Sequence, residues 1–263
     1  ASEPGYDFLA QAMAGLMAIT GEPDGQPMKA GVALSDVMTG LYAAIGILAA
    51  LQAREKTGKG QLVDVALTDC TLAGMVNIAQ YYLTSGKLAP RLGNAHSTIV
   101  PYQAFKAEDG YVIIAIGNDR QFRRFAEFLG ESWADDARFA TNQARVKNRD
   151  SLVPLITALM EEKPVAYWLE QMRIIDVPVG PVNDMDKVFA EEQIKSRKME
   201  IQMDHPLAAE PVHLVGSPLK LSDTPASYRT APPTLGQHTG DVLKELLGSD
   251  DKRLQALKDA GII

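Results

Sequence analysis

One stretch of this chain changes its pattern abruptly, and the change limits the folds available to it. Residues 60–83 read GQLVDVALTDCTLAGMVNIAQYYL. Leu62–Leu67 alternates mildly and carries β-branched valines, which predicts a strand. Residues 71–84 are apolar and typical of a helix, with a stop near Gly86. The chain is thus expected to pass from a strand into a buried helix, with one acid, Asp69, at the junction.

The remaining elements are predicted from periodicity and from turn residues. Helices are expected at residues 6–20, 37–57, 119–129, 149–161 and 164–175, and one or two more within 240–263. A hairpin is expected at 102–116, with its turn at 108–110 and a fully buried strand at 111–116, and short strands at 200–203 and 211–215. The order predicts an α/β or α+β chain with an inserted smaller domain at about 97–205.

Charge and composition exclude several classes of function. The net charge is -7 and the 26 basic residues are scattered, which argues against a nucleic-acid partner. The single cysteine, Cys70, excludes an internal disulfide and is typical of a reducing compartment, so a cytoplasmic location is expected. The four histidines have no spacing that suits a zinc site, and no metal is expected. The absence of a run of about 18 apolar residues predicts no membrane span.

Asp69 is the first candidate for chemistry, and two interpretations are open. Thr68 or Asp69 could cap the following helix by accepting hydrogen bonds from its first free N–H groups. Alternatively, Asp69 could be a nucleophile. The two roles are compatible, because the N-terminus of a helix keeps a carboxylate ionised and therefore nucleophilic.

A second candidate is the loop RLGNAHSTIVPYQ, which brings together Arg91, Gly93, Asn94 and His96. Glycine and asparagine suit a tight backbone, while arginine, asparagine and histidine are donors that could meet an anion or an oxyanion. The alternative is an ordered loop whose polar groups satisfy its own carbonyls.

Other polar residues give weaker signals. Lys29 lies in the loop GEPDGQPMKAG, which could approach a phosphate but lacks the spacing of a P-loop. Ser35 or Asp36 is expected to cap the long helix that ends at Gly58. Cys70 is interpreted as a small buried hydrophobe because no histidine lies near it in sequence.

The larger pattern points to a family. The segments GYDFLAQAMAGLM, RLGNAHSTIVPYQAF, DVPVGPVND and PPTLGQHTGDVLKELLG occur in order along the chain, together with the long block GVALSDVMTGLYAAIGILAALQAREKTGKGQLVDVALTDC. Through these segments the chain resembles the family III CoA-transferases, the CaiB–BaiF group. The block of the form RxKTGKGQxVDVxLxD is the most specific of them.

The resemblance implies an α/β fold with a Rossmann-like large domain, incomplete here, and a smaller α/β domain, in an interlocked homodimer. Residues 1–96 would belong to the large domain, 97–205 would form the small domain, and 206–263 would return to the large one. The family's early βαβ units and many CoA contacts are expected to be missing, so this chain alone is expected to be inactive.

The resemblance also implies a covalent mechanism. Asp69 would attack an acyl-CoA thioester and give an acyl–aspartyl anhydride, and the CoA thiolate would then form an aspartyl–CoA thioester. Gly93, Asn94 and His96 would belong to a flap that shields the anhydride from water. Arg91 would lie near the substrate acid and Lys29 near CoA. No cofactor is implied, because the CoA thioester is a substrate.

Two further interpretations stay open. The related acyl-CoA racemases share the fold but carry histidine where Tyr6 stands and glutamate where Asp69 stands, and they use an aspartate at the Asp36 position to move an α-proton. A fragment that only dimerises or binds a partner is the other alternative. Within the family, STIVPYQAFKAEDGYVIIAIGNDRQF and PPTLGQHT are similar to members that move CoA between dicarboxylic acids, often from succinyl-CoA.

Overall fold

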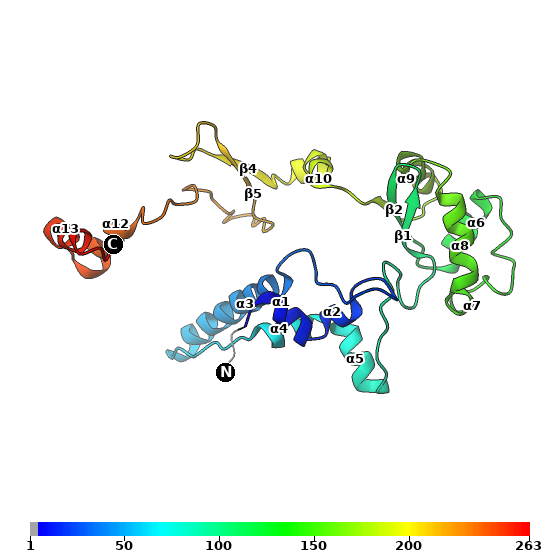
Figure 1. Ribbon diagram of the computed structural model, residues 1–263, viewed down its shortest axis with the longest axis horizontal. Helices are drawn as coiled ribbons and strands as arrows, with labels where there is room; N and C mark the ends of the chain where they lie inside the picture. Colours follow the sequence, from blue (N-terminus) through cyan, green and yellow to red (C-terminus); the bar gives the residue numbers. More distant parts are fainter. Residues whose placement is uncertain (1–4) are drawn as a thin grey trace. The chain divides into compact units, whose positions relative to one another are not determined.

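The computed structural model describes residues 5–263. They divide into two compact units, and the boundary along the chain lies between Val182 and Asn183. The first unit contains helices α1–α9 and strands β1–β3, and the second contains α10–α13 with β4 and β5 (Figure 1). The predicted domain boundaries after residues 96 and 205 stay predictions. Each unit is described by itself below.

The first helices of the chain pack on one long helix. Helices α1 (Asp7–Met13), α2 (Leu16–Ile19) and α3 (Leu34–Thr57) cover the predicted helical regions, with a break before α2 at Gly15. Helix α3 ends at Gly58, whose φ of 70° is a left-handed conformation that glycine adopts without strain. Figure 1 shows α1 lying alongside α3 and α4.

The cap of α3 differs from the prediction. Neither Ser35 nor Asp36 uses its side chain as the cap, and the N-cap position is Ala33. The Asp7 carboxylate of α1 accepts hydrogen bonds from the backbone N–H of Ser35 at 2.7 Å and of Asp36 at 3.3 Å. The helix start is therefore satisfied by a residue distant in sequence, which local pattern does not reveal.

The predicted strand at Leu62–Leu67 was wrong. Residues 59–66 form neither helix nor strand in the part of the chain that the structure describes, and Leu62 is 90% exposed. Helix α4 (Leu67–Gly74) begins where the strand was expected to end, and α5 (Val76–Ser85) follows. A strand needs a partner for its backbone groups, and alternation alone does not supply one.

The hairpin was predicted correctly, and it forms one side of the main core. Strands β1 (Tyr102–Ala107) and β2 (Gly110–Ala115) pair antiparallel, and β3 (Val179–Pro181) pairs antiparallel with β2. The expectation that residues 111–116 form a fully buried strand was wrong, because Tyr111 is 53% exposed while Val112 and Ile114 are buried. One face of the sheet faces the core and the other faces outward.

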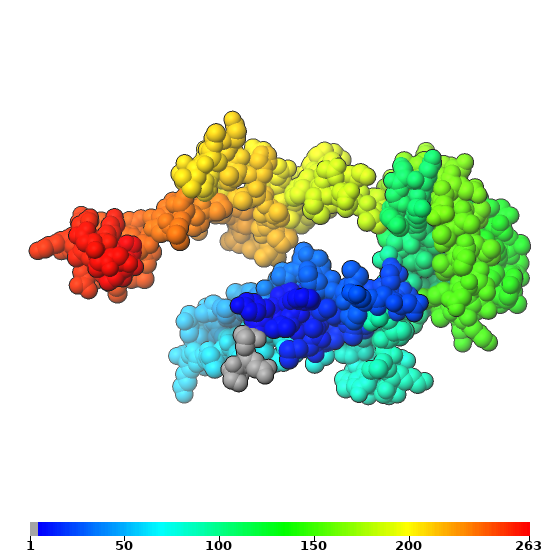
Figure 2. Space-filling view, in the orientation of Figure 1, coloured from blue at the N-terminus to red at the C-terminus, as the bar shows by residue number. Residues whose placement is uncertain are grey.

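Four helices complete this core: α6 (Asp119–Phe128), α7 (Asn142–Lys147), α8 (Arg149–Met160) and α9 (Val165–Ile174). Their buried side chains form one cluster with those of the sheet, extending along the chain from Val100 to Val177. Trp168 is buried and donates from Nε1 to the Met160 carbonyl oxygen at 2.9 Å. The segment appears in green in the space-filling view (Figure 2).

The second unit has few buried side chains. It contains α10 (Met185–Ala190), α11 (Glu192–Ser196), the strand pair β4 (Glu200–Met203) and β5 (Val212–Val215), and helices α12 (Thr239–Leu247) and α13 (Asp251–Asp259). The sequence predicted both short strands, β4 and β5, and the structure pairs them antiparallel. Leu254 is the buried large hydrophobe of this unit.

Helix α3 meets the length and hydropathy criteria for a membrane-spanning helix, although the sequence predicted no such segment. Its 24 residues are long and apolar enough to cross a membrane, with a mean hydropathy of 1.7 over the most apolar window. The small residues Gly40 and Gly46 interrupt the apolar run without lowering the mean much. One such helix is weak evidence, because a core helix of a soluble protein meets the same criteria of length and composition.

Candidate functional site

Asp69 lies in the first turn of α4, third after the N-cap residue Ala66. No side chain caps this helix, so the predicted capping role of Thr68 or Asp69 was wrong. The Asp69 side chain is exposed, and no hydrogen bond or ion pair engages its carboxylate within residues 5–263. The first turn still favours a negative charge, because the free N–H groups of the helix start carry partial positive charge.

A buried polar contact fixes α4 against α3. Thr71 Oγ1 lies 2.7 Å from Ser35 Oγ and 2.7 Å from the Leu67 carbonyl oxygen. Both hydroxyl side chains are buried, so each satisfies the other's hydrogen-bonding potential. Gly74 allows close approach of the helices, since a Cβ there would lie 2.0 Å from Met38 Cε. The helix that carries Asp69 is therefore held in register, and its neighbour Cys70 is free and buried as expected.

An apolar cavity lies on the same helix, one turn after Asp69. It is formed by α1, α2, α4, α5 and the segment that follows α5. Its lining includes Ala14, Ala18, Ile19, Leu72, Met75 and Tyr82. Leu72 is three residues after Asp69 and therefore lies on the same side of α4. Helix α4 thus carries the Asp69 carboxylate and also lines an apolar cavity.

Arg91 makes contacts that the sequence did not reveal. Its guanidinium donates to three backbone carbonyl oxygens: that of Ala18 in α2 at 3.3 Å, and those of Glu22 at 3.2 Å and Gly25 at 2.8 Å in the loop after α2. The two loops that the sequence singled out separately therefore lie together. A substrate carboxylate at Arg91 would have to compete with these three hydrogen bonds.

Gly93 also contacts the loop after α2, whereas Asn94 is exposed. Gly93 donates from its backbone N–H to the Gly21 carbonyl oxygen at 3.1 Å, with a φ of 57°. A Cβ on Gly93 would lie 2.9 Å from Glu22 Oε2, so glycine is favoured twice over at this point.

His96 is half-buried and has defined partners. Its backbone N–H donates to the Tyr102 carbonyl oxygen at 2.9 Å, and the two rings lie 5.2 Å apart. Its Nδ1 accepts from the Thr98 N–H at 3.2 Å, so the neutral ring carries its proton on Nε2. Nε2 is thus left as the donor that the predicted oxyanion role requires.

Within the part of the chain that the structure describes, the other candidates are not joined to Asp69 by polar contacts. Lys29 is exposed and donates to the Ala30 carbonyl oxygen at 3.2 Å. Among residues 5–263, no hydrogen bond or ion pair joins Asp69 to Lys29, Arg91 or His96. In the same range, no group of three or more histidine, cysteine, aspartate or glutamate side chains could hold a metal ion.

Sequence reasoning missed the residues that hold the loop from its far side. Asn142, Arg145 and Arg149 bind the backbone between His96 and Val100. Arg145 is fully buried, which nothing in the polar sequence NQARVKNR indicates. A buried arginine can be found only from its partners in the fold.

Comparison with known proteins shows which family this chain is similar to. The family model described as CoA-transferase family III matches residues 1–239. A human protein named succinyl-CoA:glutarate CoA-transferase is 40% identical over 260 residues, which cover 98% of this chain and 59% of the relative. A protein of Agrobacterium fabrum named succinate–glutarate CoA-transferase is 41% identical and is covered over 60% of its length.

A solved structure agrees with this. The CaiB/BaiF family protein from Brucella suis superposes with a TM-score of 0.82 at 43% identity, covering 93% of this chain and 63% of that one. The α/β fold therefore matches the structure of that family. This chain spans about three-fifths of the length of the relatives that it matches.

Proposed function

This chain belongs to CoA-transferase family III, and on that premise we propose that its protein transfers CoA from an acyl-CoA to a carboxylic acid, with Asp69 as the nucleophile. One observation carries the proposal. Asp69 presents an exposed carboxylate, engaged by no other described side chain, in the first turn of a firmly held helix. The relatives named as succinyl-CoA:glutarate CoA-transferases support succinyl-CoA as donor and a dicarboxylate as acceptor.

The reaction proceeds in balanced acyl exchanges. The Asp69 carboxylate attacks the thioester carbonyl and expels the CoA thiolate, which leaves an acyl–aspartyl anhydride. The thiolate then attacks the Asp69 carbonyl of the anhydride and releases the first acid as a carboxylate. The incoming carboxylate attacks the aspartyl–CoA thioester and reverses the sequence, so the new acid leaves as its CoA thioester and Asp69 is free again.

Residues of this chain contribute to these steps in distinct ways. Asp69 lies in the first turn of α4, where the free N–H groups carry partial positive charge, and the Ser35–Thr71 contact holds the helix that carries it. His96 Nε2 and the Asn94 amide are the donors proposed for the oxyanions, and the loop that carries them shields the anhydride from water. The apolar cavity beside Leu72 suits the methylene chain of an acyl group or of the pantetheine arm.

Charged residues are proposed to select the substrate. The second carboxylate of a dicarboxylic acid needs a cation, and Arg91 is the candidate within the loop, in exchange for one of its bonds to backbone carbonyls. Lys29 is exposed and is proposed for the CoA phosphates. We also propose a cytoplasmic homodimer that uses no cofactor.

A racemase is the second candidate and is less well supported. Proton transfer at an α-carbon would need a base, and the position where the resemblance expects histidine is Tyr6, which is 73% exposed. The relatives named above are transferases. A partner-binding fragment without activity is the remaining alternative for this chain alone.

The decisive experiment traps the intermediate. The protein is incubated with succinyl-CoA and then with hydroxylamine, which converts an aspartyl–CoA thioester to a hydroxamate that is visible by peptide mass spectrometry. We expect the modification at Asp69, its loss in Asp69→Asn and its retention in the control Asp64→Asn, which alters another exposed acid nearby. A folded protein that remains unmodified, both as this chain and in a chain spanning the relatives' full length, contradicts the proposal.

A further inference from the structure

Residues 91–96 are called the His96 loop. The segment that follows it, residues 97–100, is held by a set of polar side chains from α7 and α8. Asn142, the first residue of α7, accepts the backbone N–H of Val100 at its Oδ1 at 3.1 Å. Its Nδ2 donates to the Thr98 carbonyl oxygen at 2.8 Å. The Asn142 amide thus accepts one hydrogen bond from the backbone and donates another to it, as the backbone of a neighbouring strand would.

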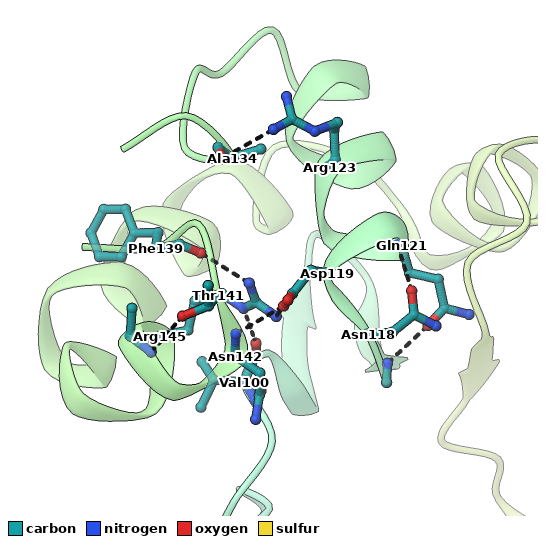
Figure 3. Close-up of polar contacts among 12 residues, drawn as sticks. Val100, Asn118, Asp119, Gln121, Arg123, Ala134, Phe139, Thr141, Asn142 and Arg145 are labelled. Carbon is teal, nitrogen blue, oxygen red and sulfur yellow. Dashed lines mark hydrogen bonds and ion pairs between the residues drawn. The ribbon is translucent and has the colours of Figure 1, made fainter. Parts of the chain in front are cut away.

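Arg145 is the fully buried member of this set of side chains (Figure 3). Its Nε donates to the Val100 carbonyl oxygen at 2.6 Å, and Nη1 donates to the Phe139 carbonyl oxygen at 2.9 Å. Nη2 pairs with Asp119 Oδ1 at 2.8 Å, and the guanidinium carbon lies 4.1 Å from the centre of the Phe122 ring. All three guanidinium nitrogens are therefore engaged, so Val100 is fixed to the core.

Arg149, the first residue of α8, reaches further towards the loop. Its Nη2 donates to the His96 carbonyl oxygen at 2.5 Å and to the Ser97 carbonyl oxygen at 3.3 Å. The first of these carbonyls belongs to His96, which carries one of the proposed oxyanion donors. Hydrogen bonds from a charged donor are the stronger kind, so this contact contributes to the placement of His96.

The loop is anchored at its other end as well. Arg91 and Gly93 bind the backbone of residues 18–25. The residues between Gly93 and His96 are therefore held on both sides, by Arg91 before them and by Arg149 after them. Movement of the loop must therefore occur between these two anchors.

We propose that Arg149 and Asn142 are positioning residues for the His96 loop and limit the access of water to the Asp69 intermediate. The inference rests on the proposed function. Loosening this anchor lets water attack the anhydride, which yields the free acid and the Asp69 carboxylate, while the CoA thiolate leaves protonated. The net reaction is then hydrolysis of acyl-CoA to acid and CoA instead of transfer.

Hydrogen exchange tests the anchor without relying on activity. In Arg149→Ala we expect amides between Asn94 and Thr98 to exchange about tenfold faster, because a hydrogen bond to a charged group contributes roughly that factor. The amide of Ile114 in β2 should be unchanged. Arg149→Lys should restore part of the protection, since it keeps the charge but loses the planar fork.

Matched variants separate positioning from general damage. Arg123→Ala removes an arginine of the same region that binds the Ala134 carbonyl oxygen and Asp135, and it should leave loop exchange unchanged. Asn142→Asp keeps an acceptor for Val100 and loses the donor to Thr98, so it should show an intermediate effect. Loop exchange that is equal in Arg149→Ala and the unsubstituted protein overturns the inference.

The ratio of acyl-CoA hydrolysis to CoA transfer tests the consequence. We expect the ratio to rise about tenfold in Arg149→Ala, in step with the loss of protection of the loop. A raised exchange rate with an unchanged ratio overturns the shielding role. If the unsubstituted protein forms no Asp69 adduct in a full-length chain, the proposed function itself fails, and the shielding role fails with it.

Discussion

At the scale of single residues, Arg145 joins three parts of the core through the hydrogen bonds of its guanidinium. It is fully buried, and burial lowers the pKa of its guanidinium while the hydrogen bond to Asp119 raises it. Arg145→Met would leave the Val100 and Phe139 carbonyl oxygens without their donor inside the core. We expect a loss of stability on the order of 3 kcal/mol, measured by urea unfolding. A loss below about 0.5 kcal/mol, the range of surface substitutions, would contradict this account.

Gly93 carries a second prediction at this scale. Its φ of 57° is strained for any residue with a Cβ, and that Cβ would lie close to the Glu22 carboxylate. Gly93→Ala should therefore cost about 1 kcal/mol and displace the loop. Gly93→Ala combined with Glu22→Ala should recover the steric part only. A chemical-shift comparison of His96 in the two variants checks the displacement.

The residues of the site were predictable in kind but not in arrangement. An acid at a helix start and the donors around Gly93 are visible in the sequence because their types carry the chemistry. Arg91 binds the backbone of another loop as well, a set of contacts that the sequence did not reveal. Asn142 and Arg149 act through contacts across about fifty residues of sequence, and no local pattern records such contacts.

At the scale of elements, the start of α3 depends on a neighbouring helix. Asp7 accepts two of the free N–H groups of α3, as an N-cap residue would. Asp7→Ala should destabilise the helix start by about 1 kcal/mol. Asp7→Asn keeps an acceptor oxygen and should cost less. Circular dichroism during urea unfolding measures both, and equal effects would show that charge, rather than the hydrogen bonds, supports the helix.

A pH prediction belongs to the junction of α12 and α13. Lys244 lies 2.6 Å from Asp251, and its hydrogen bond holds the pKa of that carboxyl below the ordinary value of 3.8. The stabilisation is complete above that ordinary value and is lost as the pH falls through the lowered pKa. In Lys244→Met the Asp251 midpoint should return upward towards 3.8. An NMR titration of the Asp251 carboxyl in both proteins checks this.

Elements were predicted well where the local signal and the fold agree. The hairpin at 102–115 combines a turn at Glu108–Asp109 with apolar strands, and β3 supplies a second partner. The segment 62–67 carries a milder strand pattern, and no other described segment pairs with it. Pairing is a property of the whole fold, so the pattern alone could not decide between strand and extended chain.

At the scale of the whole molecule, buried apolar residues are unevenly distributed. The family and its α/β fold could be predicted from sequence because the matching segments occur in order along the whole chain. The distribution of the core could not be predicted so directly. Its largest cluster lies between Val100 and Val177, whereas the unit from Asn183 onward buries little beyond Leu254.

This imbalance predicts how parts of the chain behave alone. A fragment of residues 97–182 retains the whole cluster and the three-stranded sheet, so it should unfold cooperatively in urea. A fragment of residues 183–263 buries too little apolar surface to offset its conformational entropy, so it should lack a cooperative transition. Phe122→Ala serves as the control in the first fragment, where loss of a buried ring should lower stability by about 3–5 kcal/mol. A cooperative transition in the second fragment would show that its folding does not depend on a large core.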